Sequence, residues 1–137
     1  MKIKKYLSVI LMVSILVSIV SISAYATTYS PMFTNISSID NGLSANGKTL
    51  YVDAATYGDF DINSCGVTAT LQKQSGSNWT NYKVWSATSP ASHPDYVEIS
   101  TSIVVSAGTY RLVSSHSATM GSYTEYAGMT SDIVTVS

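Results

Sequence analysis

Cysteine is almost absent from this chain, whose 137 residues include only Cys65. A single cysteine cannot form an intramolecular disulfide, so packing and backbone hydrogen bonds must stabilise the fold. We expect Cys65 to be a small buried side chain, with a disulfide-linked dimer or a reactive thiol as the alternatives. No Lys, Arg or His lies close to it in the sequence to favour a thiolate.

Charged side chains are also scarce, at 11% of the chain. Residues 1–26 contain three of the seven basic residues, and residues 27–137 contain the other four together with all eight acidic ones, a net charge of −4 with histidine neutral. Binding of nucleic acid or anionic lipid requires clustered Lys and Arg. We therefore expect no nucleic-acid partner, and no membrane partner once the N-terminal segment is removed.

The N-terminal segment, residues 1–26, has the three parts of a secretory signal peptide. Three lysines lie within the first five residues, residues 7–22 are apolar apart from serines, and Ala24-Tyr25-Ala26 supplies small residues for signal peptidase. An uncleaved membrane anchor is the alternative, although the apolar run is shorter than the ~20 residues that span a bilayer. We expect a helical, cleavable signal peptide over residues 1–26 and a secreted, extracellular domain over residues 27–137.

Helical periodicity is rare after residue 26, whereas turn signals recur at the spacing of short strands. This pattern predicts a single all-β domain: an antiparallel, two-sheet, immunoglobulin-like sandwich of about seven strands. Turns are expected at Asn41-Gly42 and Asn46-Gly47, and either Phe60 or Ile62 is expected to point inward from a loop. The expected strands cover residues 32–39, 48–57, both arms of 67–85, 96–105, 109–115 and 132–136, and residues 123–130 have no clear assignment.

Residues 67–85 predict a β-hairpin that reverses at residues 75–78. A four-residue loop sets Leu71 opposite Tyr82 and turns Trp85 outward. A three-residue loop turns Trp85 inward but brings Lys83 to the same face, because a slip of one residue inverts every side chain. A bulge near Tyr82 reconciles part of both registers, and we favour it, with Trp85 mostly buried.

Residues 107–112 contain a second feature of sandwich domains. In immunoglobulin-like domains, a tyrosine at the start of the penultimate strand bonds back to the backbone, two residues before a core position that antibodies fill with cysteine. Tyr110 fits the tyrosine, and Leu112 occupies the core position without a disulfide. We expect Leu71, Ile99 and Leu112 to meet in one core, together with Trp85.

These segments resemble small secreted proteins of clostridia and related bacteria, which are grouped as domains of unknown function with predicted sandwich folds. The matching motifs are structural, and the family brings no catalytic residues to this chain. The matched positions are residues 70–73, Ser75-Gly76, Trp79, Trp85, Val105, residues 108–111 and residues 133–136.

Asp59, Asp61 and Asn63 stand at alternate positions, as oxygen ligands do at the start of a calcium loop. An EF-hand then requires Gly at its sixth position and Glu at its twelfth, where this chain has Ser64 and Thr70. A solvated acidic loop is the main interpretation and a weak calcium site the alternative. We expect no cofactor.

Histidine is limited to His93 and His116. Either one could serve a catalytic triad or a metal site only with a suitable nucleophile or carboxylate beside it. The sequence has no Gly-x-Ser-x-Gly elbow and no His-Glu-x-x-His motif to support such a site. We therefore do not expect an enzyme.

Aromatic side chains, by contrast, are abundant, with ten tyrosines and two tryptophans. We predict that Tyr51, Tyr57, Trp79 and Tyr82 are binding anchors, because exposed Tyr and Trp bury area at a low entropic cost. Asp53 supplies a polar neighbour, and tyrosines that merely cover outer strand faces are the alternative.

The leading functional hypothesis is a secreted, monomeric, non-enzymatic module that binds an extracellular glycan or protein surface. A toxin or effector that acts on competing cells is one alternative. A protease inhibitor that presents residues 86–94 as an exposed loop is another.

The signal-peptide hypothesis predicts the first residue of the mature protein. When the full chain is expressed with a functional secretion pathway, Edman sequencing of the product in the medium should begin at Thr27, because small residues at positions 24 and 26 fit signal peptidase. A product retained in the membrane and beginning at Met1 would contradict this prediction and support the anchor.

Overall fold

The computed structural model describes residues 33–137, so the predicted signal peptide lies outside the described residues. The described chain is all-β, as predicted, with eight strands instead of about seven. No helix in residues 33–137 has the length and apolar character needed to cross a membrane. The strands are β1 (Ile36–Asn46), β2 (Thr49–Gly58), β3 (Ser64–Ser75), β4 (Asn78–Thr88), β5 (Tyr96–Val104), β6 (Gly108–Met120), β7 (Tyr123–Thr130) and β8 (Val134–Val136).

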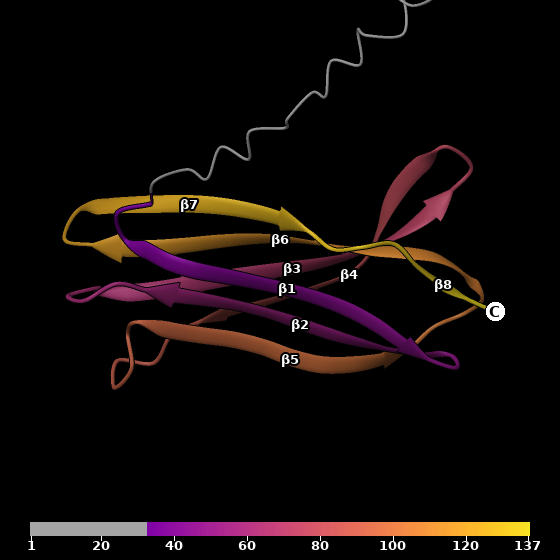
Figure 1. Ribbon diagram of the computed structural model, residues 1–137, viewed down its shortest axis with the longest axis horizontal. Helices are drawn as coiled ribbons and strands as arrows, with labels where there is room; N and C mark the ends of the chain where they lie inside the picture. Colours follow the sequence, from indigo (N-terminus) through magenta and orange to yellow (C-terminus); the bar gives the residue numbers. More distant parts are fainter. Residues whose placement is uncertain (1–32) are drawn as a thin grey trace, which may run out of the picture. The chain divides into compact units, whose positions relative to one another are not determined.

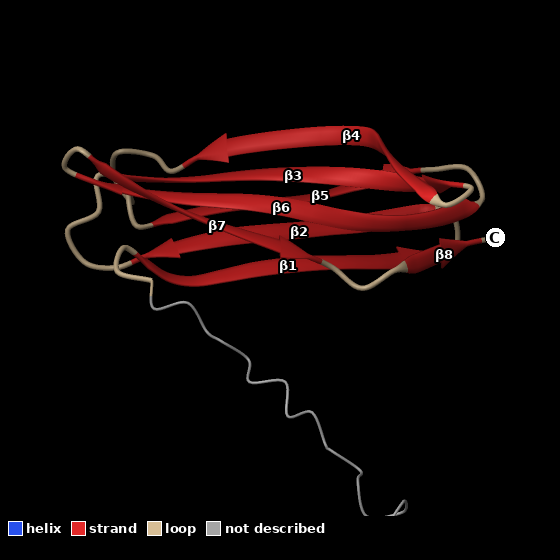
Figure 2. Ribbon diagram, turned by 90° about the horizontal axis from the view of Figure 1, so that it is seen from above, coloured by secondary structure: helices blue, strands red, loops and turns tan. Residues whose placement is uncertain are grey.

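The strands form two antiparallel sheets that pack face to face, which confirms the predicted sandwich (Figure 1). Sheet A has the strand order β1-β2-β5. Sheet B has the order β4-β3-β6-β7, and β8 pairs with the start of β6. Figure 2 shows β4 at the edge of sheet B. In the seven-stranded immunoglobulin arrangement the fourth strand lies in the sheet of the first, second and fifth, whereas β4 here pairs with β3.

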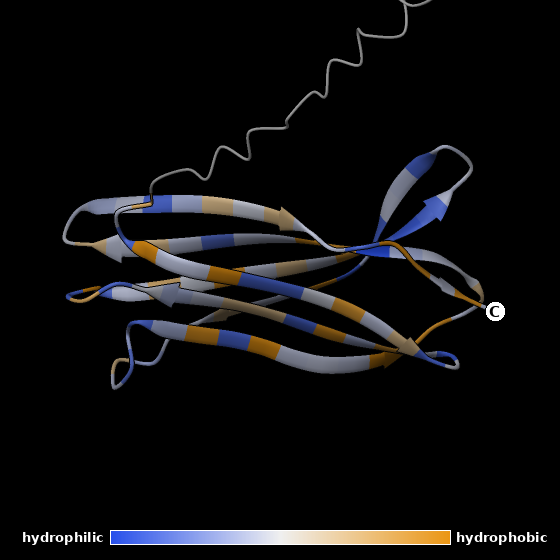
Figure 3. Ribbon diagram, in the orientation of Figure 1, coloured by the Kyte–Doolittle hydropathy of each residue, from blue (hydrophilic) through white to orange (hydrophobic). Residues whose placement is uncertain are grey.

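Alternate side chains of β2, β3, β5 and β6 form one apolar core between the sheets. Leu71 and Leu112 are fully buried, Ile99 is 8% exposed, and all three belong to the same cluster. Trp85 is partly buried and packs against this cluster. Full burial of such side chains contributes roughly 1.5–3 kcal/mol each. The alternation is visible as changing colour bands along β1 and β5 in Figure 3.

The β3–β4 hairpin has the bulged register that we favoured. Leu71 pairs with Lys83 but Gln72 pairs with Asn81, so Tyr82 is the additional residue of the bulge. The turn has only two residues between the paired Ser75 and Asn78, tighter than either expected loop. Gly76 occupies its first position with φ 60°, a conformation that costs glycine little. Figure 1 shows the end of this hairpin bending away from the two sheets.

One of the two turns expected in this part of the chain was wrong. Asn41-Gly42 is no turn but lies inside β1, where Asn41 pairs with Ala54 and Gly42 with Asp53. Continuous pairing with β2 outweighs the local turn preference of the dipeptide, because strand propensity depends strongly on context. The turn expected at Asn46-Gly47 is confirmed: the chain reverses there between β1 and β2, and Gly47 has φ 58°.

The remaining uncertain segments are also settled by the fold. Residues 123–130, left unassigned by the sequence, form β7 and pair along the second half of β6. In the loop between β2 and β3, Ile62 is the residue that points inward, at 5% exposure, whereas Phe60 is 91% exposed.

Tyr110 makes the backbone hydrogen bond that its sequence context predicted. Its hydroxyl donates to the Ser106 carbonyl oxygen at 2.8 Å, and its ring is completely buried. Lys73 Nζ lies 5.4 Å from the centroid of this ring and donates to Ser106 Oγ at 2.7 Å. Tyr110 therefore joins the turn before β6 to the core.

Replacing Tyr110 by Phe removes this bond without creating a large cavity. We expect the free energy of unfolding to fall by about 1–2 kcal/mol, because the Ser106 carbonyl loses its partner. Urea denaturation followed by tryptophan fluorescence measures the change. Tyr126→Phe is the matched control, because Tyr126 is 71% exposed. An equal effect of the two substitutions would contradict the assigned role.

Candidate functional site

The outer surface of sheet A carries a group of tyrosines and carboxylates, which we call the tyrosine face. Tyr51 and Tyr57 of β2 point outward and are 44% and 40% exposed. Tyr96 of β5 pairs with Tyr57 in register, and their ring centroids are 5.0 Å apart with an interplanar angle of 40°. Alternation along each strand places these rings on the side opposite to the core. The tyrosine face consists of Tyr51, Asp53, Tyr57, Tyr96, Glu98 and Ser100.

Hydrogen bonds hold the polar groups of the tyrosine face in place. Ser100 Oγ donates to Asp53 Oδ1 at 2.7 Å, and the Tyr96 hydroxyl donates to Glu98 Oε2 at 2.8 Å. The bond to Glu98 raises the pKa of Tyr96 to about 12, so this hydroxyl stays protonated. Each bond uses one carboxylate oxygen. The strands of sheet A contain Asp40, Asp53 and Glu98 but no Lys, Arg or His, so this surface is negative.

The structure separates the four predicted anchors. Tyr51 and Tyr57 share the tyrosine face, whereas Trp79 and Tyr82 belong to the β3–β4 hairpin of sheet B. Trp79 lies against the guanidinium of Arg111, and Tyr82 packs edge-on against Tyr110 with a centroid distance of 5.7 Å. Tyr96 belongs to the face but was not predicted as an anchor. The missing signal was the β2–β5 register, which sets it beside Tyr57.

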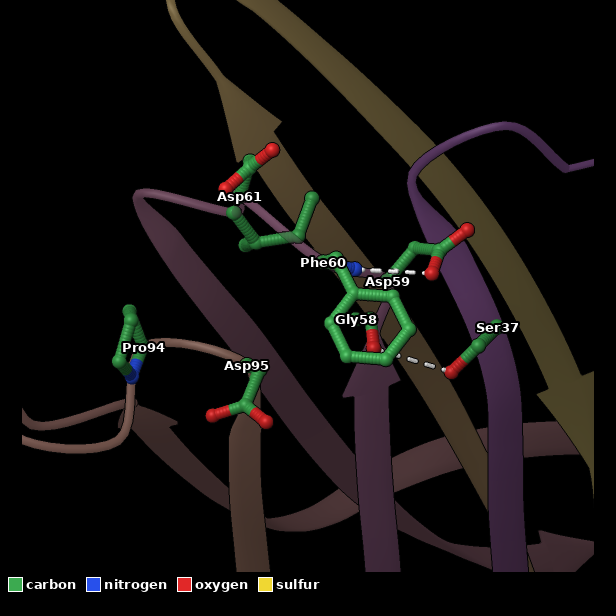
Figure 4. A pocket seen from close by; sticks show the side chains of 8 residues that line it. Ser37, Gly58, Asp59, Phe60, Asp61, Pro94 and Asp95 are labelled. Atoms are coloured by element: carbon green, nitrogen blue, oxygen red, sulfur yellow. Dashed lines mark hydrogen bonds between the residues drawn. The ribbon is translucent and has the colours of Figure 1, made fainter.

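A pocket lies at the end of the sandwich where β2 meets the loop to β3 (Figure 4). Its lining includes Phe60 and three carboxylates, those of Asp59, Asp61 and Asp95. Figure 4 shows these carboxylates pointing in different directions. Asn63, the third predicted calcium ligand, instead accepts a hydrogen bond from the Gly121 backbone through its side-chain oxygen. Residues 33–137 hold no group of three or more His, Cys, Asp or Glu side chains arranged for a metal ion.

A buried polar chain connects the two sheets around His116, which is fully buried. Thr56 Oγ1 donates to the Gly66 carbonyl at 3.0 Å and lies 2.8 Å from His116 Nδ1. His116 Nε2 lies 2.7 Å from Ser114 Oγ, which accepts from Asn41 Nδ2 at 2.7 Å. Because the Thr56 hydroxyl already donates to Gly66, His116 donates to Thr56 through Nδ1, and burial favours the neutral ring, in which Nε2 accepts from Ser114. Burial lowers the pKa of His116, and the negative charge of Asp40 opposes this shift only in part.

The two histidines therefore occupy different environments. His116 contacts hydroxyl groups inside the core, away from solvent, whereas His93 is exposed in the connection between β4 and β5. The proposed inhibitor loop, residues 86–94, is only partly a loop, because residues 86–88 belong to β4. Ser89 is the first residue after β4. Its Oγ donates a hydrogen bond to the Pro94 carbonyl oxygen at 2.9 Å, which fixes the two ends of this connection to each other.

Cys65 is buried, at 1% exposure. Burial and the nearby Asp95 both raise the pKa of its thiol, which disfavours the reactive thiolate. The position agrees with the expected small core residue. A disulfide to a second chain would require the sandwich to open locally.

Glu125 joins the two sheets by a contact that the sequence did not indicate. Its carboxylate on β7 accepts hydrogen bonds from the backbone N–H groups of Thr34, Asn35 and Ile36 at 2.8–3.0 Å. Partial burial raises the pKa of Glu125, but the three bonds outweigh it and the pKa is lowered overall. This carboxylate positions the start of β1 beside sheet B.

Comparisons with known proteins identify no relative by sequence. No family model and no curated protein matches this chain. Among solved structures, the chain is similar to the solution structure of CsgH from R. palustris, with 11% identity and a TM-score of 0.38. The alignment covers 66% of this chain and 88% of that one. A likeness at this level carries no argument about function.

The buried, neutral His116 predicts a pH dependence of stability. The unfolded chain binds a proton near the ordinary histidine pKa of 6.5, whereas the folded chain does so only at lower pH. The unfolded state then holds more protons, so stability is complete above pH 6.5 and declines below it by at most about 1.4 kcal/mol per pH unit. Urea denaturation between pH 7.5 and pH 5 measures this slope.

Replacing His116 by Gln should flatten the slope in this pH range, even if the variant is less stable at pH 7.5. His93→Gln is the matched control and should retain it, because His93 is exposed. The same slope in the wild-type protein and the His116→Gln variant would assign the dependence to other groups.

Proposed function

We propose that this protein is a secreted, non-enzymatic module that binds an uncharged extracellular glycan on the tyrosine face of sheet A. The observation that supports the proposal is the in-register pair Tyr57–Tyr96, with Tyr51 further along the same side of β2 and hydrogen-bonded carboxylates between them. Secretion rests on the sequence of residues 1–26.

The chemistry of the face suits a sugar chain. Tyrosine rings present rigid apolar surface on which a sugar ring packs, with little side-chain entropy to lose. Asp53 and Glu98 are held by Ser100 and Tyr96 through one oxygen each, and their carboxylates accept hydrogen bonds from sugar hydroxyls. Prior fixation of these groups lowers the ordering cost of binding.

The charge of the face selects among glycans. Three carboxylates without a basic side chain on the sheet A strands repel acidic polysaccharides and favour uncharged ones. A protein partner fits less well, because hot spots of protein interfaces are apolar centres from which water is excluded, whereas this face has carboxylates between its rings. Among residues 33–137, no contact favours a toxin or an inhibitor over a binding module.

Substitutions on the face test the proposal. Affinity gel electrophoresis with an uncharged β-glucan, a mannan and a xylan should show retardation of the wild-type protein by at least one of them. Tyr51→Ala and Tyr57→Ala should each weaken that binding at least tenfold, about 1.4 kcal/mol, because each removes a ring that packs on the sugar.

Tyr126→Ala is the matched control, since Tyr126 of β7 is more exposed and lies on sheet B. It should leave the retardation unchanged. Absence of retardation with all three polysaccharides, or equal losses in the control and the two face variants, would overturn the proposal.

A further inference from the structure

Arg111 is held in a defined position on the outer surface of sheet B, whereas the tyrosine face belongs to sheet A. Its Cζ atom lies 4.3 Å from the centroid of the Trp79 ring, the distance of a cation–π contact. Its Nε atom donates to Gln72 Oε1 at 2.8 Å, and Gln72 Nε2 donates to Asn81 Oδ1 at 2.9 Å. Three adjacent strands, β4, β3 and β6, thus fix one guanidinium group.

These contacts occupy only part of the guanidinium. An arginine has five N–H donors, and the bond to Gln72 uses the one on Nε. Trp79 and Gln72 are neutral, so neither balances the positive charge. The three strands that hold Arg111 contain no Asp or Glu. The terminal nitrogens are therefore available to a planar anion at little ordering cost, because the side chain is already fixed.

The surroundings of Arg111 consist largely of hydroxyl and amide groups. Thr70 and Gln72 of β3 point to the same side as Arg111, and Thr68 Oγ1 lies 3.0 Å from Ser86 Oγ further along this surface. Such groups donate and accept hydrogen bonds with a polyhydroxylated chain. Lys73 and Lys83 pair with the buried Tyr110 and Leu71 and so lie on the opposite side of this sheet, which leaves Arg111 as the basic residue of the β3, β4 and β6 strands on the outer surface.

We propose that Arg111, supported by Trp79, Gln72 and Asn81, is a second binding site that takes the carboxylate of an acidic extracellular polysaccharide. The guanidinium receives the carboxylate through two parallel hydrogen bonds, and the hydroxyl and amide side chains of β3 and β4 contact the sugar. This site is independent of the proposed function, because it lies on the other sheet and selects the opposite charge. The two surfaces give the module separate attachments to uncharged and acidic glycans.

Polygalacturonate, a uronic-acid polymer, is the probe for this site. Affinity gel electrophoresis at 20 mM salt should show retardation of the wild-type protein, and 300 mM salt should weaken it. Arg111→Gln should reduce binding at least tenfold. Arg111→Lys should lose several-fold, because an ammonium keeps the charge but not the paired donors. Lys48→Gln is the matched control: it removes one positive charge from the turn between β1 and β2 and should have little effect.

Additional variants and a competition experiment distinguish a specific site from general charge attraction. Tyr51→Ala should leave polygalacturonate binding intact, and Arg111→Gln should leave binding of uncharged polysaccharides intact. Thermal unfolding of each variant verifies its fold. Inorganic phosphate at 10 mM, compared with chloride at equal ionic strength, should displace the polymer only weakly if sugar contacts contribute. Equal losses in Arg111→Gln and Lys48→Gln, equal affinity of Arg111→Lys and wild type, or complete displacement by phosphate would overturn the assignment.

Discussion

Burial of every second side chain between two sheets is the constraint on which this protein depends. With no internal disulfide available, the interior must be closed by packing, and Leu50, Leu71, Tyr110 and Leu112 are entirely excluded from solvent. The same pleat that commits these residues to the core leaves their neighbours on the outer surfaces. Core and candidate binding surfaces are therefore two consequences of one register.

Polar groups reinforce this apolar interior at three places. His116 connects Thr56 of sheet A with Ser114 of sheet B, Glu125 binds the backbone that leads into β1, and Tyr110 secures the turn before β6. Buried hydrogen bonds of this kind contribute modestly when formed and cost more when one partner is lost. The His116 and Glu125 contacts also connect the two sheets, as a disulfide does in antibody domains.

The two outer surfaces differ in chemistry. Sheet A presents tyrosines beside carboxylates, whereas the outer surface of sheet B near the hairpin presents Arg111 near hydroxyl and amide side chains. A charged ligand that is attracted to one of these surfaces is therefore not attracted to the other. Their separation by the core lets one small domain offer opposite electrostatic surfaces without direct interference, because exposed charges are screened within about 8–10 Å at ordinary salt.

The sequence was sufficient to predict an all-β sandwich, the core positions Leu71, Ile99 and Leu112, the bulge at Tyr82 and the backbone bond of Tyr110. These features depend on local alternation and on turn residues, which neighbouring residues specify. Only the tertiary structure decided that Tyr96 joins Tyr57, that Arg111 covers Trp79, and that His116 bridges the sheets. Each of these contacts joins residues on different strands, so it depends on register and sheet order, which alternation within a single strand does not encode.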